Sequence, residues 1–228
     1  MSSSQYSPNR ISPITPDQPL LSTLLQESAV RHQHLCPRQV LGVRLALGGL
    51  RVLGLIGQDY RPRFINDNKR LLTIVETDGC VADGIAISTG CTIGKRTLRI
   101  VDHGKVATTL IDTSSKSIIR VSPTAGSRNL AKVYAPHAES IWHAYLKAYQ
   151  IIPDEELIKI EKVRLTLPLE EILSKPDIRV LCSQCAEEII NEREIIRSGV
   201  ILCRHCAGDR YYQPDSSFQV TPSKQSHT

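Results

Sequence analysis

The sequence predicts an α+β protein: a mixed core domain with helices packed on a mainly antiparallel sheet, followed by a small four-cysteine zinc module of treble-clef or ribbon type. Three observations support this class. The 228 residues are 41% hydrophobic and 22% charged, which suffices for one buried core and an appendage. Helix-type and strand-type apolar patterns are mixed along the first two thirds of the chain. Two Cys-x-x-Cys pairs follow after residue 180.

Composition divides the chain into five parts. Residues 1–19 hold four prolines and five serines, and such a segment cannot offset the entropy lost on ordering. The stretch from 154 to 177 is charged and interrupted by prolines, as domain boundaries often are. We therefore expect a disordered leader at 1–19, a core domain at 20–152, a linker at 153–178, a zinc module at 179–212 and a disordered tail at 213–228.

Two apolar segments predict the first helices. Leucines at near-helical spacing predict a helix over residues 20–30. Residues 37–55 predict a second helix that is apolar nearly all round, which is typical of a central, buried helix. Gly42, Ala46, Gly48 and Gly49 keep this helix thin, so a neighbouring backbone can approach closely, at some cost in helix propensity.

The strands of the core come next. Apolar and β-branched residues predict strands over 71–77, 98–102, 106–112 and 117–121. A short helix is expected over 81–88, and another over 136–150, which carries the single tryptophan, Trp142. Residues 163–167 fit either a further strand or an extended linker.

Charge and hydropathy exclude several classes of protein. The formal net charge of +5 permits an anionic partner without requiring one. Arg44 and Arg51 interrupt the most apolar stretch, so we expect no membrane-spanning helix. The first 19 residues lack the apolar core of a secretory signal. Seven cysteines are too few for a disulfide scaffold, which predicts a cytoplasmic protein in a reducing compartment.

The strongest motif is the cysteine quartet. Cys182, Cys185, Cys203 and Cys206 form two Cys-x-x-Cys knuckles separated by 17 residues, the spacing of a structural zinc site. A two-residue gap lets both sulfurs of a knuckle face one tetrahedral ion. Two redox-active pairs would need a thioredoxin-like βαβ context, which is absent. We expect a small hairpin between the knuckles and a short helix over 207–212.

A second constellation lies between the first two helices. His32, His34 and Cys36 place three potential ligands on five residues. Pro37 suits the first position of a helix, which puts Cys36 at the helix cap, where backbone N–H groups and the helix dipole favour a thiolate. Such a sulfur is a good metal ligand or nucleophile, although a lone buried cysteine is usually inert. We predict a functional site here.

Cys80 and Cys91 flank the short predicted helix. A rise of about 1.5 Å per residue places these two positions roughly 15 Å apart, too far for both to bind one ion unless the helix is shorter or bends. We favour Cys80 as the partner of Cys36, with Cys91 as the second candidate.

Two loops add cations. Residues 89–96, with small residues, hydroxyls, Lys95 and Arg96, have the composition to hold an anionic group. This loop is not a Walker motif, because only three residues separate Gly90 from Gly94. Residues 102–105, which include Lys105, are most simply a turn with solvated charges.

Four ordered motifs together resemble the FmdE family of formylmethanofuran dehydrogenase subunits. They are His32-Gln-His-Leu-Cys-Pro37, Asp78-Gly-Cys80 with Asp83, Thr89-Gly-Cys-Thr-Ile-Gly-Lys95 and Asp102-His-Gly-Lys105. The resemblance covers about residues 20–150, and the cysteine quartet resembles a zinc domain that many members append. Gln33, Arg38 and His103 stand where the family commonly has Gly, Gly and Tyr.

The resemblance implies a metal-binding active site in an α+β core. Carried over by motif, His34 and Cys36 are the leading ligands, His32 is a ligand or a neighbour of one, and Cys80 or Cys91 supplies a further thiolate. Lys95 and Lys105 are implied to line the pocket as electrostatic groups.

Three hypotheses follow. The first is a metalloprotein with a structural zinc and a second ion, zinc, nickel or iron, that binds or acts on a small anionic molecule; His34, Cys36, Lys95 and Lys105 would be its catalytic residues. The second is an accessory protein that docks on a redox enzyme. The third, a nucleic-acid-binding regulator, is disfavoured because the zinc module carries more acidic than basic residues. The thin second helix is compatible with a homodimer.

Overall fold

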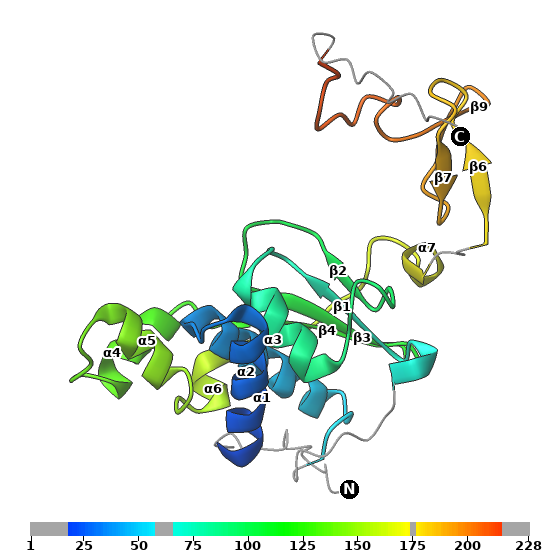
Figure 1. Ribbon diagram of the computed structural model, residues 1–228. Coiled ribbons are helices and arrows are strands. Elements are labelled where there is room, and N and C mark those ends of the chain that lie inside the picture. Colours follow the sequence, from blue (N-terminus) through cyan, green and yellow to red (C-terminus); the bar gives the residue numbers. More distant parts are fainter. Residues whose placement is uncertain (1–17, 58–65, 174–176, 216–228) are drawn as a thin grey trace, which may run out of the picture. The chain divides into compact units, whose positions relative to one another are not determined.

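The computed structural model describes residues 18–57, 66–173 and 177–215 (Figure 1). Contacts divide the chain into two compact units, a core unit (residues 1–165) and a C-terminal unit (residues 166–228). Most of the expected leader and tail lies outside the described residues. Within the described part, no helix has both the length and the apolar character needed to cross a membrane.

A five-stranded sheet forms the base of the core unit. Its strands are β1 (Leu71–Val75), β2 (Leu98–Ile100), β3 (Thr108–Asp112), β4 (Ser117–Pro123) and β5 (Ile158–Lys162). They lie in the order β2-β1-β3-β4-β5. The pair β1–β2 is parallel and the other three pairs are antiparallel. The predicted α+β class with a mainly antiparallel sheet is therefore confirmed.

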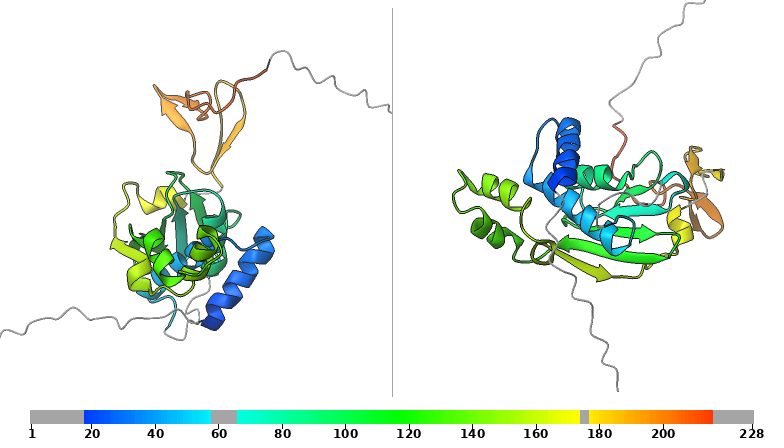
Figure 2. Two further views of the ribbon diagram at one scale, coloured as in Figure 1. Left: turned by 90° about the vertical axis from the view of Figure 1, so that its left-hand side faces the viewer. Right: turned by 90° about the horizontal axis from the view of Figure 1, so that it is seen from below.

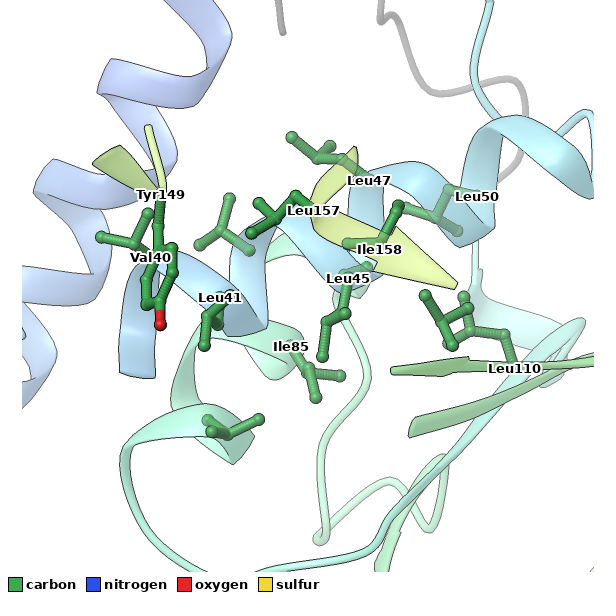
Figure 3. Packing of buried hydrophobic residues seen from close by; sticks show 14 of the residues in the cluster. Val40, Leu41, Leu45, Leu47, Leu50, Ile85, Leu110, Tyr149, Leu157 and Ile158 are labelled. Carbon is green, nitrogen blue, oxygen red and sulfur yellow. The ribbon is translucent and has the colours of Figure 1, made fainter. Parts of the chain in front are cut away.

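Three helices follow from the apolar patterns near the start of the chain. They are α1 (Gln18–His32), α2 (Pro37–Val52) and α3 (Cys80–Thr89). Helix α2 packs on β3, β4 and β5, while α1 and α3 pack against α2 and each other (Figure 2). Leu45 and Leu50 of α2 lie in one buried cluster with Ile85 of α3, Leu110 of β3 and Ile158 of β5 (Figure 3).

Helices α2 and α3 touch backbone to backbone. A Cβ atom at Gly42 would overlap the carbonyl oxygen of Val81, and one at Gly84 would overlap the carbonyl oxygen of Gln39. The close approach predicted from the small residues of α2 is therefore present, and its partner is α3. This crossing fixes the position of the α3 N-terminus relative to α2.

The segment expected to be a linker contains regular structure. Residues 154–162 form α6 (Asp154–Leu157) and β5, and β5 pairs with β4 along five residues. Leu157 and Ile158 are buried, which explains why this charged stretch joins the sheet.

The expected helix over 136–150 begins only at Ile141, as α5 (Ile141–Ala148), where Ser140 Oγ accepts the His143 N–H. The sequence prediction also lacked α4 (Ser127–Tyr134).

The C-terminal unit consists of α7 (Leu169–Leu173) and two antiparallel pairs. Strand β6 (Arg179–Leu181) pairs with β7 (Glu188–Ile190), and β8 (Ile195–Arg197) pairs with β9 (Val200–Leu202). Ser198 and Gly199 both have positive φ, as a two-residue type I′ hairpin requires. The helix expected over 207–212 is absent, because Gly208 with φ 103° directs the chain into a turn. The ribbon alternative therefore describes this unit better than a treble clef.

Candidate functional site

The four cysteines of the C-terminal unit converge on one point. Cys182 directly follows β6 and Cys203 directly follows β9, so each knuckle continues a hairpin strand. The Sγ atoms of Cys182, Cys185, Cys203 and Cys206 all lie within 4.8 Å of one another. Among the described residues, no other group of three or more His, Cys, Asp or Glu side chains is placed to hold one metal ion. The set can hold a metal ion.

Backbone donors and crowded sulfurs set the protonation of this cluster. Backbone N–H groups of Cys185 and Cys203 lower the pKa of the Cys182 thiol to about 6, and the Cys203 N–H lies 3.3 Å from its Sγ. Burial and then the neighbouring thiol of Cys203 raise the pKa of Cys206 to about 12. Four thiolates at such spacing repel one another unless a cation lies among them, and zinc favours four thiolate ligands.

In the core unit, the close crossing of α2 and α3 brings two helix N-termini together. Cys36 is the N-cap of α2, with Pro37 in the first turn, and Cys80 is the first residue of α3. Cys36 and Cys80 line the same cavity, and the Cys36 thiol raises the pKa of Cys80. The predicted cap position of Cys36 and the predicted helix start at Cys80 are both observed. Cys80, which we favoured over Cys91 as the metal-binding partner of Cys36, lines the same cavity as Cys36, and Cys91 does not.

His32 extends the pair. Its Nε2 lies 3.3 Å from Cys80 Sγ, and its Nδ1 lies 2.9 Å from Asp83 Oδ2, one turn along α3. A carboxylate on one ring nitrogen fixes the orientation of the imidazole and makes the other nitrogen a better ligand. His34, which the resemblance implied as a leading ligand, is exposed and does not line the cavity described below; the centre of its ring lies 4.8 Å from that of His32. Gln33 between them has φ 67°, a left-handed conformation that suits the Gly found there in the resembled family.

Gln39 holds Cys36 in place. Its Oε1 accepts the Cys36 backbone N–H at 2.7 Å, and its Nε2 donates to the backbone carbonyl and the hydroxyl of Ser28 on α1. Gln39 and Ser28 are both fully buried. The loop with the two histidines is therefore anchored at both of its ends.

The Cys80 thiol is not activated by its surroundings alone. Burial raises its pKa, and the adjacent Cys36 thiol raises the pKa further, despite the opposing charge of Arg38. A divalent cation next to both sulfurs would reverse this balance, because a metal ion deprotonates a coordinating thiol.

A cavity of about 410 Å³ opens beside the two cysteines. Sequence reasoning missed most of its walls, since they come from α4, α5 and the residue after Pro37. The residues that line it are Cys36, Pro37, Arg38, Leu41, Cys80, Val106, Ser127, Arg128, Trp142, Tyr145 and Tyr149. The spacing of the three aromatic residues could have indicated one common helix face, but no local signal placed that face opposite the cysteines.

Three predicted site residues lie elsewhere. Cys91 is fully buried under β1, where its Sγ accepts hydrogen bonds from Thr73 Oγ1 and Asn66 Nδ2. Lys95 is exposed in the turn before β2 and does not line the cavity. Lys105 is exposed beside the lining residue Val106. The cations that do line the cavity are Arg38 and Arg128.

The two motifs that carried those residues are structural. Thr89 Oγ1 donates to the Ile85 carbonyl, and Thr92 N–H donates to Thr97 Oγ1, so the hydroxyls of the first loop serve the loop itself. In the second loop, Asp102 accepts the Gly104 N–H, and the His103 N–H donates to the Glu76 carbonyl. This agrees with the interpretation of residues 102–105 as a turn with solvated charges.

Arg44 and Arg51 of α2 have their partners within the core unit. Arg44 is 1% exposed and donates to Asp154 and to the carbonyl oxygens of Tyr149 and Ile152. Arg51 pairs with the same Asp154 at 2.8 Å. These arginines fix α2 to the segment after α5 rather than facing a polyanion.

Comparison with known proteins decides the family. The family model described as "FmdE, Molybdenum formylmethanofuran dehydrogenase operon" matches residues 31–174, more than half of the chain. The chain belongs to the FmdE family. This confirms the resemblance inferred from the four motifs, all of which lie within the matched region.

This FmdE-family chain is similar to one curated protein in sequence and to one crystal structure in fold. It is 28% identical over 215 residues to a "Probable S-adenosyl-L-methionine-binding protein" of Archaeoglobus fulgidus, covering 85% of the chain. The chain spans about half the length of that curated relative, 55%. A crystal structure of a tungsten formylmethanofuran dehydrogenase FmdE-like protein from Syntrophus aciditrophicus matches with a TM-score of 0.52 at 20% identity. That match covers 85% of this chain and 95% of the other, and it supports the fold.

Proposed function

We propose that this FmdE-family chain binds two metal ions, a structural zinc in the C-terminal unit and a second transition metal in the core unit, where the ion binds or acts on a small anionic molecule. The observation that carries the proposal is the contact between Cys80 Sγ and His32 Nε2, together with a cavity that both Cys80 and Cys36 line. Thiolate and imidazole ligands together suit zinc, nickel or iron.

Zinc is proposed for the cysteine quartet on the chemistry of its donors. Four sulfurs without an open position are typical of structural zinc rather than of a catalytic ion. The seven cysteines are all free thiols, which fits a function in a reducing compartment such as the cytoplasm.

The proposed core metal site differs from the cysteine quartet in being open. Cys36, Cys80 and His32 offer fewer than four protein ligands, and the cavity next to them leaves room for a further ligand on the ion. An ion there would supply Lewis-acid chemistry or an activated water. Asp83 would orient His32, while Arg38 would attract an anion to the same place.

Metal analysis tests the proposal. Protein purified without added metal, then loaded with zinc and dialysed, is expected to hold two ions per chain. Cys36→Ser should hold one, with unchanged circular dichroism, while Cys91→Ala serves as the control and should still hold two. One ion per chain in both the parent and Cys36→Ser would refute the core metal site.

An accessory role is the second candidate, favoured by the solved relative, which is named as an FmdE-like protein of a tungsten enzyme. Here the chain would dock on a redox enzyme, or on a second copy of itself, and the core site would not turn over substrate. Affinity purification from cells is the test, because a stoichiometric partner would support docking, whereas a lone chain would argue against it.

A further inference from the structure

The cavity of the core unit is lined by aromatic side chains and by arginines, and the metal proposal gives the aromatic side chains and Arg128 no function. Its volume of about 410 Å³ falls in the range of small-molecule sites. Two of the proposed metal ligands, Cys36 and Cys80, line it. Three aromatic side chains and two arginines line it as well.

The aromatic wall comes from one helix face. Trp142, Tyr145 and Tyr149 stand at positions i, i+3 and i+7, which places them in a row about 10 Å long on α5 and its C-cap. The rings of Tyr145 and Tyr149 are stacked at 5.6 Å with an interplanar angle of 5°. Trp142 remains 42% exposed and lines the cavity. A large ring left open in a cavity favours an apolar, flat occupant.

Two cations accompany the aromatic row. Arg38 lies near Cys80, and its charge lowers the pKa of that thiol, while Arg128 acts in the same direction on the Tyr149 phenol. Neither arginine forms an ion pair with any residue that the structure describes. No described residue that lines the cavity is acidic. The cavity therefore carries uncompensated positive charge, and guanidinium groups bind carboxylate or phosphate in preference to other anions.

We infer that the occupant is a fused aromatic ring that carries a carboxylate or a phosphate, with the ring against Trp142 and Tyr145 and the anion at Arg38 and Arg128. This inference rests on the proposed function for the presence of a metal at Cys36 and Cys80, and it adds the class of ligand. Base-like rings bind aromatic side chains through their faces, and the anion adds charge-assisted hydrogen bonds.

The single tryptophan makes the test direct. Because Trp142 is the only one in the chain, quenching of its fluorescence reports on this cavity alone. The full chain is titrated with adenosine 5′-monophosphate, S-adenosyl-L-methionine, adenosine and inorganic phosphate. The first two join the same ring to a phosphate and to a carboxylate. We expect saturable quenching by at least one of them, with a Kd at least about tenfold below that of adenosine and of phosphate.

Two matched variants locate the anion. Arg128→Gln should raise the Kd by about tenfold or more, whereas Lys132→Gln, the same change at an exposed position of α4 outside the cavity lining, should leave the Kd unchanged. Tyr145→Leu should weaken binding by at least about fivefold while keeping an apolar side chain in the core.

The outcomes are distinct for the two proposals. Absence of saturable quenching by both ring-bearing anions, or equal effects of Arg128→Gln and Lys132→Gln, would overturn the inference on ligand class. Metal content measured on the same samples decides the proposed function separately, since two ions per chain without nucleotide binding would leave the metal proposal intact.

Discussion

At the scale of single residues, the candidate core site depends on a chain of contacts from Asp83 through His32 to Cys80. Asp83 accepts from one nitrogen of His32, and the other nitrogen meets the sulfur. The ring is thereby held in one orientation at the end of α1. Replacing any one of these three residues should have a separate, measurable effect on metal binding.

Asp83→Asn tests the role of the carboxylate that contacts His32. Asparagine keeps the size of the side chain but removes its charge, so His32 becomes a weaker ligand. We expect the affinity of the core site for zinc to fall by about 10- to 100-fold, as for other carboxylate partners of metal-binding histidines. Competition with a zinc-binding dye measures the affinity. An unchanged affinity would show that His32 does not bind the ion.

The sequence indicated these residues better than it indicated their surroundings. Cys36 and Cys80 could be placed at helix starts because cap chemistry is local and Pro37 marks the start of α2. His34 was expected as a leading ligand, whereas His32 is the histidine that contacts Cys80. Lys95 and Lys105 were selected as the cations, whereas Arg38 and Arg128 line the cavity. Arg128 lies on a helix more than ninety positions after Cys36, and only the packing of α4 on α5, and of α5 on α2, brings it near.

At the scale of elements, the crossing of α2 and α3 decides whether the two helix N-termini meet. Gly42 and Gly84 allow it, since either Cβ atom would overlap the other helix's backbone. The composition of α2 predicted a close neighbour without identifying it. The identity of α3 as that neighbour comes from tertiary packing.

Gly42→Ala is expected to destabilise the core unit. The added methyl group has backbone rather than a flexible side chain in front of it, so the helices must separate, at a cost of about 1–3 kcal/mol. A drop of roughly 2–4 °C in Tm for each kcal/mol follows for a protein of this size. Thermal unfolding followed by circular dichroism measures it. Gly94→Ala, where a Cβ meets nothing within 4 Å, is the control and should shift Tm little.

The strands β1 and β4 are linked across β3 by Glu76 and Arg120. Arg120 Nε donates to Glu76 at 2.6 Å and Nη2 donates at 2.8 Å. The hydrogen bond from Arg120, with its charge and those of Lys105 and His103, holds the pKa of Glu76 below its usual range. Because the folded-state pKa is the lower one, the pair stabilises the fold above the unfolded carboxyl pKa of about 4.3. This contribution is lost as the pH falls through the folded-state pKa.

Arg120→Gln tests this pH dependence. The variant should be less stable than the parent near neutral pH, and the difference should shrink as the pH is lowered below about 4. Urea unfolding at a series of pH values gives the free energy of unfolding for both proteins. A difference that stays constant across the acid range would contradict the assignment to Glu76.

At the scale of the whole molecule, the two units differ in what holds them together. The core unit has one continuous apolar cluster that includes helices and sheet. In the described part of the C-terminal unit, the buried hydrophobic side chains are Ile172, Cys182, Ile189 and Ala207. So small a core cannot offset the entropy of ordering two hairpins, and a structural metal commonly stabilises such units.

Metal removal should therefore unfold one unit and spare the other. Binding of a structural zinc contributes roughly 10–16 kcal/mol in small zinc domains, so a strong chelator should unfold residues 179–206. Limited proteolysis with mass spectrometry should then show new cleavage in that range, while residues 18–57 and 66–165 stay protected. Cleavage that is equal with and without the chelator would contradict a structural role for the metal.

The central claim is that the core unit binds a metal ion through its own sulfur ligands. Cobalt(II) loaded into the full-length Cys203→Ser/Cys206→Ser variant tests it most directly, because sulfur-to-cobalt charge-transfer absorption is then dominated by Cys36 and Cys80. We expect such a band, and we expect it to disappear when Cys36→Ser is added. An absorption spectrum without a charge-transfer band, or one that Cys36→Ser leaves unchanged, would contradict the claim.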